Sequence, residues 1–194
     1  MKIPKKIVSV GLATEKKPEV EVINKDHVSL PDDAPARVKT LRAEGKKWYL
    51  TVTYLPGTEK PFALFCHTNS HEKSAQTSDA VERMLALARR KGIAERLVVQ
   101  IEEKTQHDSN TSKLTRAISF LLRHGVLISN IVAELENVEE VYVGSFLFQI
   151  KKFLANYILE GTIAVGHVCH ECGTALIFSE GCYRCPSCGY SKCG

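Results

Sequence analysis

Residues 169–194, CHECGTALIFSEGCYRCPSCGYSKCG, contain six of the seven cysteines in the chain. Two CxxC pairs in this stretch are each followed directly by a glycine, and twelve residues separate them. Each pair bends the backbone so that two thiolates reach one metal ion, and the glycine permits the tight turn. The intervening ALIFS supplies the strand that a ribbon requires. The spacing predicts a zinc ribbon whose structural ion is bound by Cys169, Cys172, Cys185 and Cys188.

A second choice of ligands is open, because Cys182 and Cys185 also form a CxxC pair. The alternative ligand set is Cys169, Cys172, Cys182 and Cys185. It would leave Cys188 and Cys193 outside the metal site. The glycines favour the first set, in which Cys182 and Cys193 remain as candidate redox thiols. Either set supplies four thiolates, which close a zinc site to water and substrate, so we expect a structural rather than a catalytic ion.

Composition and charge are those of a soluble globular chain. The 194 residues are 44% hydrophobic and 25% charged, which suits one domain with a small appendage or two small domains. No apolar run reaches the ~18 residues that span a bilayer, and the apolar stretch near the N-terminus is too short for a signal peptide. We therefore expect a cytoplasmic chain without membrane association. Reducing conditions there favour metal binding or redox chemistry for clustered cysteines over structural disulfides.

Residues 1–36 are predicted to form a basic N-terminal arm. Short apolar stretches in the arm could form strands, and LPDDAPAR interrupts them with two prolines and two aspartates. The net charge of the whole chain is only +4, which does not by itself require a nucleic-acid partner. The candidate phosphate or partner contacts of the arm are Lys5, Lys6, Lys16 and Lys17.

The middle of the chain predicts a β-hairpin followed by helices. Residues 47–55 alternate β-branched and aromatic side chains, PGTEKP has turn chemistry, and residues 62–68 are predicted as the returning strand. Residues 79–103 and 113–137 then repeat one pattern of helix, basic residue, glycine and second helix, at an offset of roughly 33 to 34 residues. A fifth helix is expected within 143–161. The apolar helix faces favour packing over DNA recognition, so the sequence predicts an α+β fold of helical hairpins on a small sheet.

Polar residues and a glycine are predicted to bound these helices. Asp79 with Glu82 resembles a capping box at the start of the first helix. Asn110 and Ser112 are candidate N-caps for the third helix. Gly161 is expected to end the fifth helix and to open a linker, TIAVGHV, into the cysteine-rich stretch.

Three stretches resemble the C-terminal region of adenosylcobalamin-dependent (class II) ribonucleotide reductases. GKKWYLTVTYLPGTEKPFALF (45–65) and AVERMLALARRKGI (80–93) are similar to the small TSCPD domain of that family, and residues 169–194 are similar to its cysteine-rich tail. The resemblance implies a TSCPD-like α+β domain over 37–160 and a zinc ribbon over 167–194. In that family the tail is associated with zinc and with cysteines that pass reducing equivalents to the active site.

The chain departs from that family in two respects. The family's reductase chemistry takes place in a large barrel with a radical-forming cysteine, and a chain of 194 residues leaves no room for it. The segment RAEGKKWY (42–49) also lacks the cysteine that the family places just before the first strand of this domain. Cys66, the one cysteine outside the tail, is predicted to pack in a core rather than to react. We therefore expect an accessory module and not an enzyme.

The first functional hypothesis is a non-enzymatic zinc-binding adapter that belongs to a larger protein complex acting on nucleic acid or nucleotides. Aromatic and basic side chains alternate near the CxxC pairs and could stack on bases and contact phosphates. These candidate contacts are Tyr183, Arg184, Tyr190 and Lys192. The alternative interpretation is that the same four side chains only cover a small ribbon.

The second functional hypothesis is a redox-active tail, or a split subunit of a class II reductase, that acts in trans on a separate catalytic chain. This role needs two thiols outside the metal site that exchange with a partner. Cys182 with Cys193, or Cys188 with Cys193, could supply them.

Overall fold

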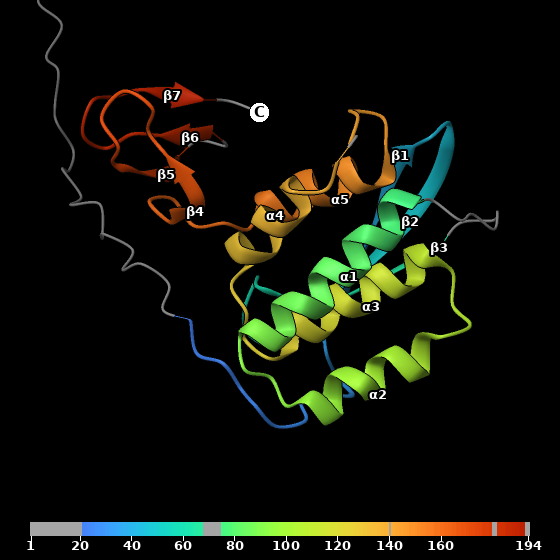
Figure 1. Ribbon diagram of the computed structural model, residues 1–194. Helices are drawn as coiled ribbons and strands as arrows, with labels where there is room; N and C mark the ends of the chain where they lie inside the picture. Colours follow the sequence, from blue (N-terminus) through green and yellow to red (C-terminus); the bar gives the residue numbers. More distant parts are fainter. Residues whose placement is uncertain (1–20, 68–74, 140, 180–181, 193–194) are drawn as a thin grey trace, which may run out of the picture.

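The computed structural model describes residues 21–67, 75–139, 141–179 and 182–192. Within these residues the chain has an α+β architecture, as the sequence predicts. A body made of one antiparallel sheet and five helices is followed by a small C-terminal sheet that lies beside α4 (Figure 1).

The sheet of the body has three antiparallel strands in the order β1-β2-β3. Their bounds are Ala36–Ala43 for β1, Lys46–Tyr54 for β2 and Pro61–His67 for β3. Strands β2 and β3 form the hairpin that the alternation predicts, and Trp48, Leu50 and Val52 of β2 are buried in the core. The sequence does not predict β1, because only Leu41 and Ala43 of this strand are buried and it shows no sustained alternation.

Five helices cover the sheet and one another. They are α1 (Ala75–Arg90), α2 (Glu95–Thr105), α3 (Asn110–Arg123), α4 (Ile128–Glu136) and α5 (Phe146–Ala155). Helix α3 packs on β3 and beside α1, while α4 lies against α5 and α1 (Figure 1). The buried side chains of the sheet and helices form one continuous core, in which Phe146 lies against Trp48 with ring centroids 4.6 Å apart. None of the described helices has the length and apolar character needed to cross a membrane.

The two helical hairpins, α1–α2 and α3–α4, share one turn geometry. Gly92 at φ +74° and Gly125 at φ +82° follow the first helix of each hairpin. In each turn the glycine amide donates to the carbonyl three residues earlier at 3.0 Å, and the next amide donates to the carbonyl five residues earlier at 3.1 Å. This is the Schellman arrangement, which needs a residue with positive φ and therefore favours glycine.

Three predicted helix bounds are wrong. Asp79, the first residue of the predicted capping box, lies inside α1 instead of at its N-cap. Ser109 caps α3 by accepting a hydrogen bond from the Ser112 amide, so the cap precedes the predicted Asn110. Gly161, at φ +80°, lies in the turn before the C-terminal sheet and not at the end of α5. Several polar residues stand close together at each of these places, and the local pattern does not decide among them.

Residues 21–28, called here the N-terminal strap, cross the turn between α3 and α4. The amide of Asn24 donates to the carbonyl of His124 at 2.9 Å. The Val22 carbonyl lies so close to Gly125 that a Cβ at Gly125 would be 2.2 Å from its oxygen. The turn therefore needs glycine for its backbone angle and also for the approach of the strap.

Glu21, in the strap, supplies the side-chain cap that α4 lacks. Leu127 precedes α4 and its side chain makes no cap. The Oε1 atom of Glu21 accepts from the Leu127 amide at 3.1 Å and from Asn130 Nδ2 at 2.6 Å, and Oε2 accepts from Lys91 Nζ at 2.5 Å. Burial alone would raise the pKa of Glu21, but these three donors hold its pKa below the ordinary value.

Candidate metal centre

The C-terminal sheet carries two similar turns that hold cysteines. Its antiparallel strands are β4 (Ile163–Val168), β5 (Ala175–Ser179), β6 (Cys182–Arg184) and β7 (Ser191–Lys192), in that order. The segment TIAVGHV, predicted as a linker, contains β4. One CxxC turn connects β4 to β5 and the other connects β6 to β7. We call this sheet with its two turns the ribbon.

Both CxxC turns have the same backbone hydrogen bonds. In the first turn the Cys169 amide donates to the Thr174 carbonyl at 2.8 Å, and the Gly173 amide donates to the Cys169 carbonyl at 2.8 Å. Gly173 has φ +71°, a conformation that side-chain-bearing residues rarely adopt. The second turn repeats these contacts at 2.7 and 3.1 Å, with the corresponding residues Cys185, Tyr190 and Gly189. The repeated geometry accounts for the glycine after each CxxC pair.

The two turns bring four thiols together. The Sγ atoms of the cluster all lie within 4.8 Å of one another, so they could hold one metal ion. The closest pairs are Cys172–Cys185 at 3.4 Å and Cys169–Cys188 at 3.5 Å, each joining one turn to the other. The first cysteine of each turn is buried and the second is exposed. These four residues are the first of the two ligand sets that the sequence suggests.

The thiols of the cluster differ in acidity. Hydrogen bonds from the side chain and the backbone of Thr174 lower the pKa of Cys172 to about 6. The backbone of Tyr190 acts to lower the pKa of Cys188, but the neighbouring sulfurs together outweigh it and raise that pKa to about 12. A metal ion binds thiolates, so it must displace the remaining protons and its affinity falls as the pH falls.

Cys182 opens β6 and lies outside the four-sulfur cluster. It is disulfide-bonded, whereas the other cysteines among the described residues are free thiols. Cys193, the second candidate redox thiol, lies outside the described residues. The structure therefore separates Cys182 from the four clustered thiols.

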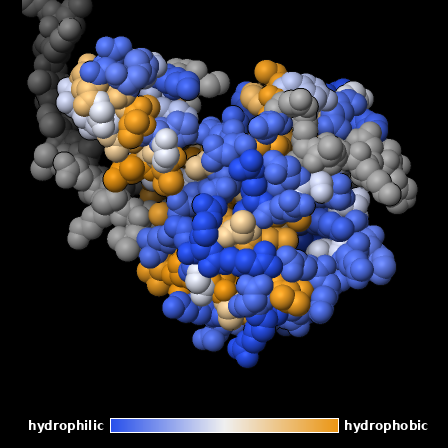
Figure 2. All heavy atoms as spheres, in the orientation of Figure 1, coloured by the Kyte–Doolittle hydropathy of each residue, from blue (hydrophilic) through white to orange (hydrophobic). Residues whose placement is uncertain are grey.

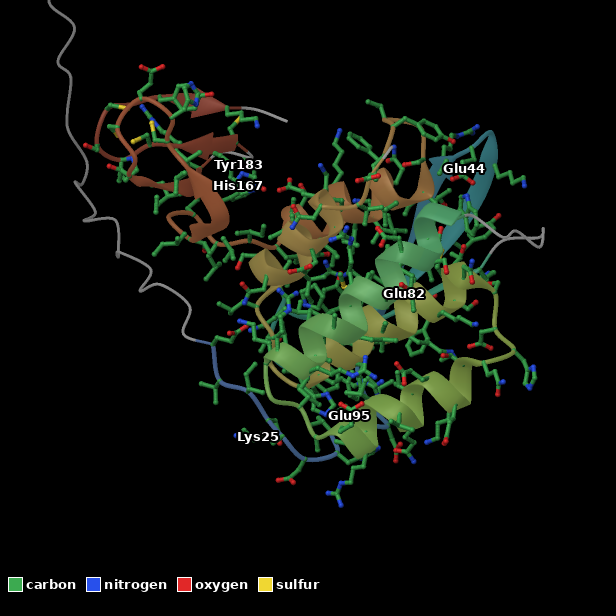
Figure 3. All side chains as sticks on the ribbon, in the orientation of Figure 1. Lys25, Glu44, Glu82, Glu95, His167 and Tyr183 are labelled. Atoms are coloured by element: carbon green, nitrogen blue, oxygen red, sulfur yellow. The ribbon has the colours of Figure 1, made fainter. Side chains whose placement is uncertain are left out.

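Glu136, the last residue of α4, joins the body to the ribbon. Its Oε2 atom accepts a hydrogen bond from the Tyr183 hydroxyl at 2.9 Å and lies 3.0 Å from His167 Nε2. Lys151 Nζ on α5 approaches Oε1 at 3.5 Å. The rings of His167 and Tyr183 stack with centroids 4.4 Å apart, on the side of the ribbon that faces the helices (Figure 3). Burial and the Glu136 carboxylate raise the pKa of Tyr183, which keeps its hydroxyl a donor.

Sequence reasoning missed Glu136. Its ribbon partners lie 31 and 47 residues further along the chain, and the local pattern of α4 does not identify them. Acidic residues at the C-terminal end of a helix are unfavourable for the helix dipole, which is the one local signal that it has a tertiary partner.

The four predicted ribbon contacts have different environments. Tyr183 is half-buried against Glu136, and Tyr190 packs on the buried core of the ribbon with its ring edge-on to His170 at 4.2 Å. Arg184 and Lys192 are exposed, on β6 and β7. The lysines of the predicted basic arm, Lys5, Lys6, Lys16 and Lys17, lie outside the described residues.

A cleft of about 480 Å³ separates the ribbon from α4 and α5. Phe148, Phe178 and Tyr183 contribute aromatic side chains to it, and Lys151 and Lys152 contribute cations. Beside the cleft, β4 exposes apolar side chains, visible as the hydrophobic area of the ribbon in Figure 2. These side chains are Ile163, Val165 and Val168. Glu136 and Glu160 also line the cleft, so the junction of body and ribbon is a surface where aromatic, apolar and charged groups of both signs occur together.

Cys66 is placed as predicted, away from the metal-binding thiols. It is buried on β3, and burial raises the pKa of its thiol to about 12. The neighbouring His67 is exposed, because adjacent strand residues point to opposite faces. This geometry does not form a cysteine–histidine nucleophile.

Comparison with models of protein families, with curated proteins and with solved structures finds no match for this chain.

Proposed function

We propose that the chain is a non-enzymatic zinc-binding accessory module that joins a larger assembly acting on nucleic acid or nucleotides. The four-sulfur cluster carries this proposal. A tetrahedral site with Zn–S distances of about 2.3 Å separates its sulfurs by about 3.8 Å. Sγ pairs at 3.4 and 3.5 Å need only a small expansion to reach that separation. Four thiolates fill the coordination shell, so the ion stabilises a fold and performs no reaction.

Zinc is the ion that the donors favour. Thiolates are soft ligands, and four of them in tetrahedral arrangement suit zinc or iron. The two glycine-containing CxxC turns are typical of structural zinc sites. The resemblance of residues 169–194 to the zinc-associated tail of class II ribonucleotide reductases points to the same ion.

The junction surface supports a role in binding. Arg184 and Lys192 extend from the strands that the metal would fix, and Lys152 is exposed on the far side of the cleft. Aromatic side chains in the cleft offer faces on which bases could stack. A polyanionic strand or a nucleotide is therefore the partner chemistry that this surface fits.

Two measurements on the purified chain test the proposal. Metal analysis should find one zinc ion per chain. Fluorescence anisotropy with labelled single- and double-stranded oligonucleotides should show an affinity that weakens as salt rises. Replacing Arg184 and Lys192 together by glutamine should weaken binding. It should also make the slope of log binding constant against log salt concentration shallower, by roughly one for each lost phosphate contact.

The matched control is a double substitution with the same change of charge on β1, Lys39→Gln with Arg42→Gln. Both residues are exposed and belong to the body. Equal losses in the two double variants would mean that net charge, and not the ribbon surface, governs binding. Turnover of a nucleotide by the chain alone would contradict the non-enzymatic role.

The disulfide at Cys182 favours a second candidate function, the redox-active tail acting in trans. In its reduced form the pair Cys182–Cys193 would pass two electrons and two protons to a disulfide of a catalytic partner and become a disulfide itself. A dithiol reductant would then reduce the pair again. Mild dithiothreitol should then reduce Cys182, detected by alkylation and mass spectrometry, while zinc stays bound. Zinc loss at the same reductant concentration would count against this function.

A further inference from the structure

A second cavity lies between α2 and α3. Figure 1 shows α2 on the side of the body away from the ribbon. Its volume is about 200 Å³, and His27 of the N-terminal strap contributes to its wall. Leu97, Ile101 and Phe120 give it an apolar surface. Drug-sized ligands occupy cavities of about 300–1,000 Å³, so this one suits a smaller group.

Three cations line this cavity, and no acidic residue is among the described residues that line it. They are Lys104, Arg116 and Arg123. Arg116 has a carboxylate partner, Asp108, at 3.0 Å. Lys104 and Arg123 have none among the described residues. The local charge is therefore positive in excess.

Arg123 is the strongest sign of an anion site. Its side chain is half-buried, and burial lowers the pKa of its guanidinium. Its Nε donates to the Ser119 carbonyl at 3.2 Å, which leaves the terminal nitrogens without a protein partner in the described part of the chain. A cation withdrawn from water is costly unless an anion or several acceptors compensate it.

His124 provides an independent observation in the same cavity. The side chain is 2% exposed, and Nδ1 lies 2.7 Å from the Phe120 carbonyl, to which it donates. Burial lowers the pKa of His124, and this outweighs the opposing influence of the Phe120 and Asp26 backbones. The ring is therefore neutral with its lone pair on Nε2, and this buried atom makes no hydrogen bond with the residues that the structure describes. A buried polar atom without a partner calls for a ligand or a water.

We propose that this cavity binds a phosphate ester that carries a hydroxyl group close to the phosphate, as a phosphorylated sugar does. The phosphate contacts Arg123 and Lys104, with Arg116 beside them, and the hydroxyl donates to Nε2 of His124. The carbon face of the sugar lies on Phe120 and its apolar neighbours. The same chemistry is present in a free sugar phosphate and at the phosphorylated end of a nucleic-acid strand. This site does not rest on the adapter function of the ribbon.

Isothermal titration of the full chain with ribose 5-phosphate tests the site, with ribose and inorganic phosphate as comparisons. We expect ribose 5-phosphate to bind best and ribose not to bind. Arg123→Gln should weaken the affinity at least 10-fold, and Lys104→Gln, an exposed change that leaves the core intact, should weaken it several-fold. His124→Phe should remove the advantage of ribose 5-phosphate over inorganic phosphate.

The matched control is Arg96→Gln, which removes the same charge from an exposed position of α2 outside the cavity. Equal weakening by Arg96→Gln and Lys104→Gln, or no binding of ribose 5-phosphate at millimolar concentration, overturns the proposal.

A 5′-phosphorylated oligonucleotide that binds more tightly than ribose 5-phosphate, and depends on Arg123, identifies a strand end as the source. Equal binding of the phosphorylated and unphosphorylated oligonucleotides by the Arg184/Lys192 double variant excludes a strand end and leaves a free sugar phosphate as the ligand. Loss of oligonucleotide binding in the Arg184/Lys192 double variant, with ribose 5-phosphate binding kept, separates this site from the ribbon.

Discussion

The body and the ribbon are stabilised in different ways. The body has one continuous apolar core made of its sheet and all its helices. Among the described residues, the buried hydrophobic cluster of the ribbon consists of Ala164, Cys169, Leu176 and Cys185, and two of these are metal-binding candidates. A segment with so small a core buries little apolar surface, so we expect a bound metal ion to supply much of its folding free energy. We therefore expect the apolar core to stabilise the body and a metal ion to stabilise the ribbon.

The two parts do not share an apolar core. The apolar clusters of body and ribbon are separate, and the hydrogen bonds between the parts converge on Glu136. We therefore expect the body to keep its structure when the ribbon loses its own.

The largest effect is expected from Cys185→Ser. Binding of a structural zinc ion supplies about 10–16 kcal/mol in small zinc-binding peptides, and loss of one thiolate removes most of it. Zinc content should fall from one ion per chain to near zero. Amide resonances of 163–192 should collapse to unfolded positions in NMR spectra, while those of the body shift little.

The control for this change is Cys66→Ala, because Cys66 is buried in the body and far from the metal cluster. It should lower the stability of the body and leave the zinc content at one ion per chain. Unfolding of the body in Cys185→Ser would show that the two parts are not independent.

The next largest effect is expected from Phe146→Ala. Phe146 is 2% exposed and packs against Trp48, so its removal leaves a cavity. Such substitutions cost about 3–5 kcal/mol of unfolding free energy. Urea unfolding followed by Trp48 fluorescence should show this loss, and zinc content of the folded fraction should be unchanged. A loss below about 1 kcal/mol would contradict the core-stabilised description of the body.

The sequence predicted best what depends on short-range chemistry. The CxxCG spacing indicated the cysteines that cluster, because each turn is complete within six residues, as the Cys169–Thr174 hydrogen bond shows. The same holds for the hairpin of β2 and β3 and for the Schellman turns at Gly92 and Gly125, which are visible as alternation and as a glycine after a helix.

The sequence failed where distant segments decide the structure. Strand β1 is an edge strand with mostly exposed side chains, so it pairs without an apolar pattern. Strand β4 exposes Ile163, Val165 and Val168 and contains a glycine, and its segment therefore resembled a linker. Glu21 contacts Leu127 across 106 residues, and Glu136 contacts Tyr183 across 47. No local pattern marks such partners.

A smaller effect is expected from Gly125→Ala, which tests how the strap is held on the body. The residue has φ +82° and a Cβ there would lie 2.2 Å from the Val22 oxygen. Strain and displacement of the strap should together cost about 2–3 kcal/mol. Gly57→Ala is the matched control, since Gly57 has φ +75° and nothing within 4 Å of an added Cβ. If urea unfolding shows equal losses of stability in both variants, the contact between the Val22 carbonyl and Gly125 does not contribute to the effect.

Glu136→Gln tests the junction itself. The substitution keeps the shape of the side chain but removes the charge that strengthens its hydrogen bonds to the ribbon, which should weaken the contact by about 1–2 kcal/mol. Zinc content should stay at one ion per chain, while NMR relaxation should show faster, more independent tumbling of the ribbon. A double-mutant cycle with Tyr183→Phe should give a coupling energy of about 0.5–1.5 kcal/mol. Zero coupling would mean that Glu136 does not position the ribbon.

The smallest effect, and one that depends on pH, is expected at Glu21. The folded-state pKa of Glu21 lies below its ordinary value. Its carboxylate therefore stabilises the body at pH values above the unfolded-state pKa of about 4.3. This stabilisation is lost as the pH falls through the lower folded-state pKa. Glu21→Gln keeps an acceptor for the Leu127 amide but loses the ion pair with Lys91, which should cost about 0.5–1 kcal/mol at pH 7.

Urea unfolding at pH 7, 5 and 3 measures this difference, with both proteins carrying Cys185→Ser so that acid release of metal does not contribute. The stability gap between the protein with Glu21 and the Glu21→Gln variant should be present at pH 7 and 5 and should shrink toward pH 3, because the protonated carboxyl and the amide are then nearly equivalent. A gap that is absent, or that is constant with pH, would show that the charge of Glu21 does not stabilise the body. In that case the strap would be held by backbone contacts such as that between Asn24 and His124, and not by charge.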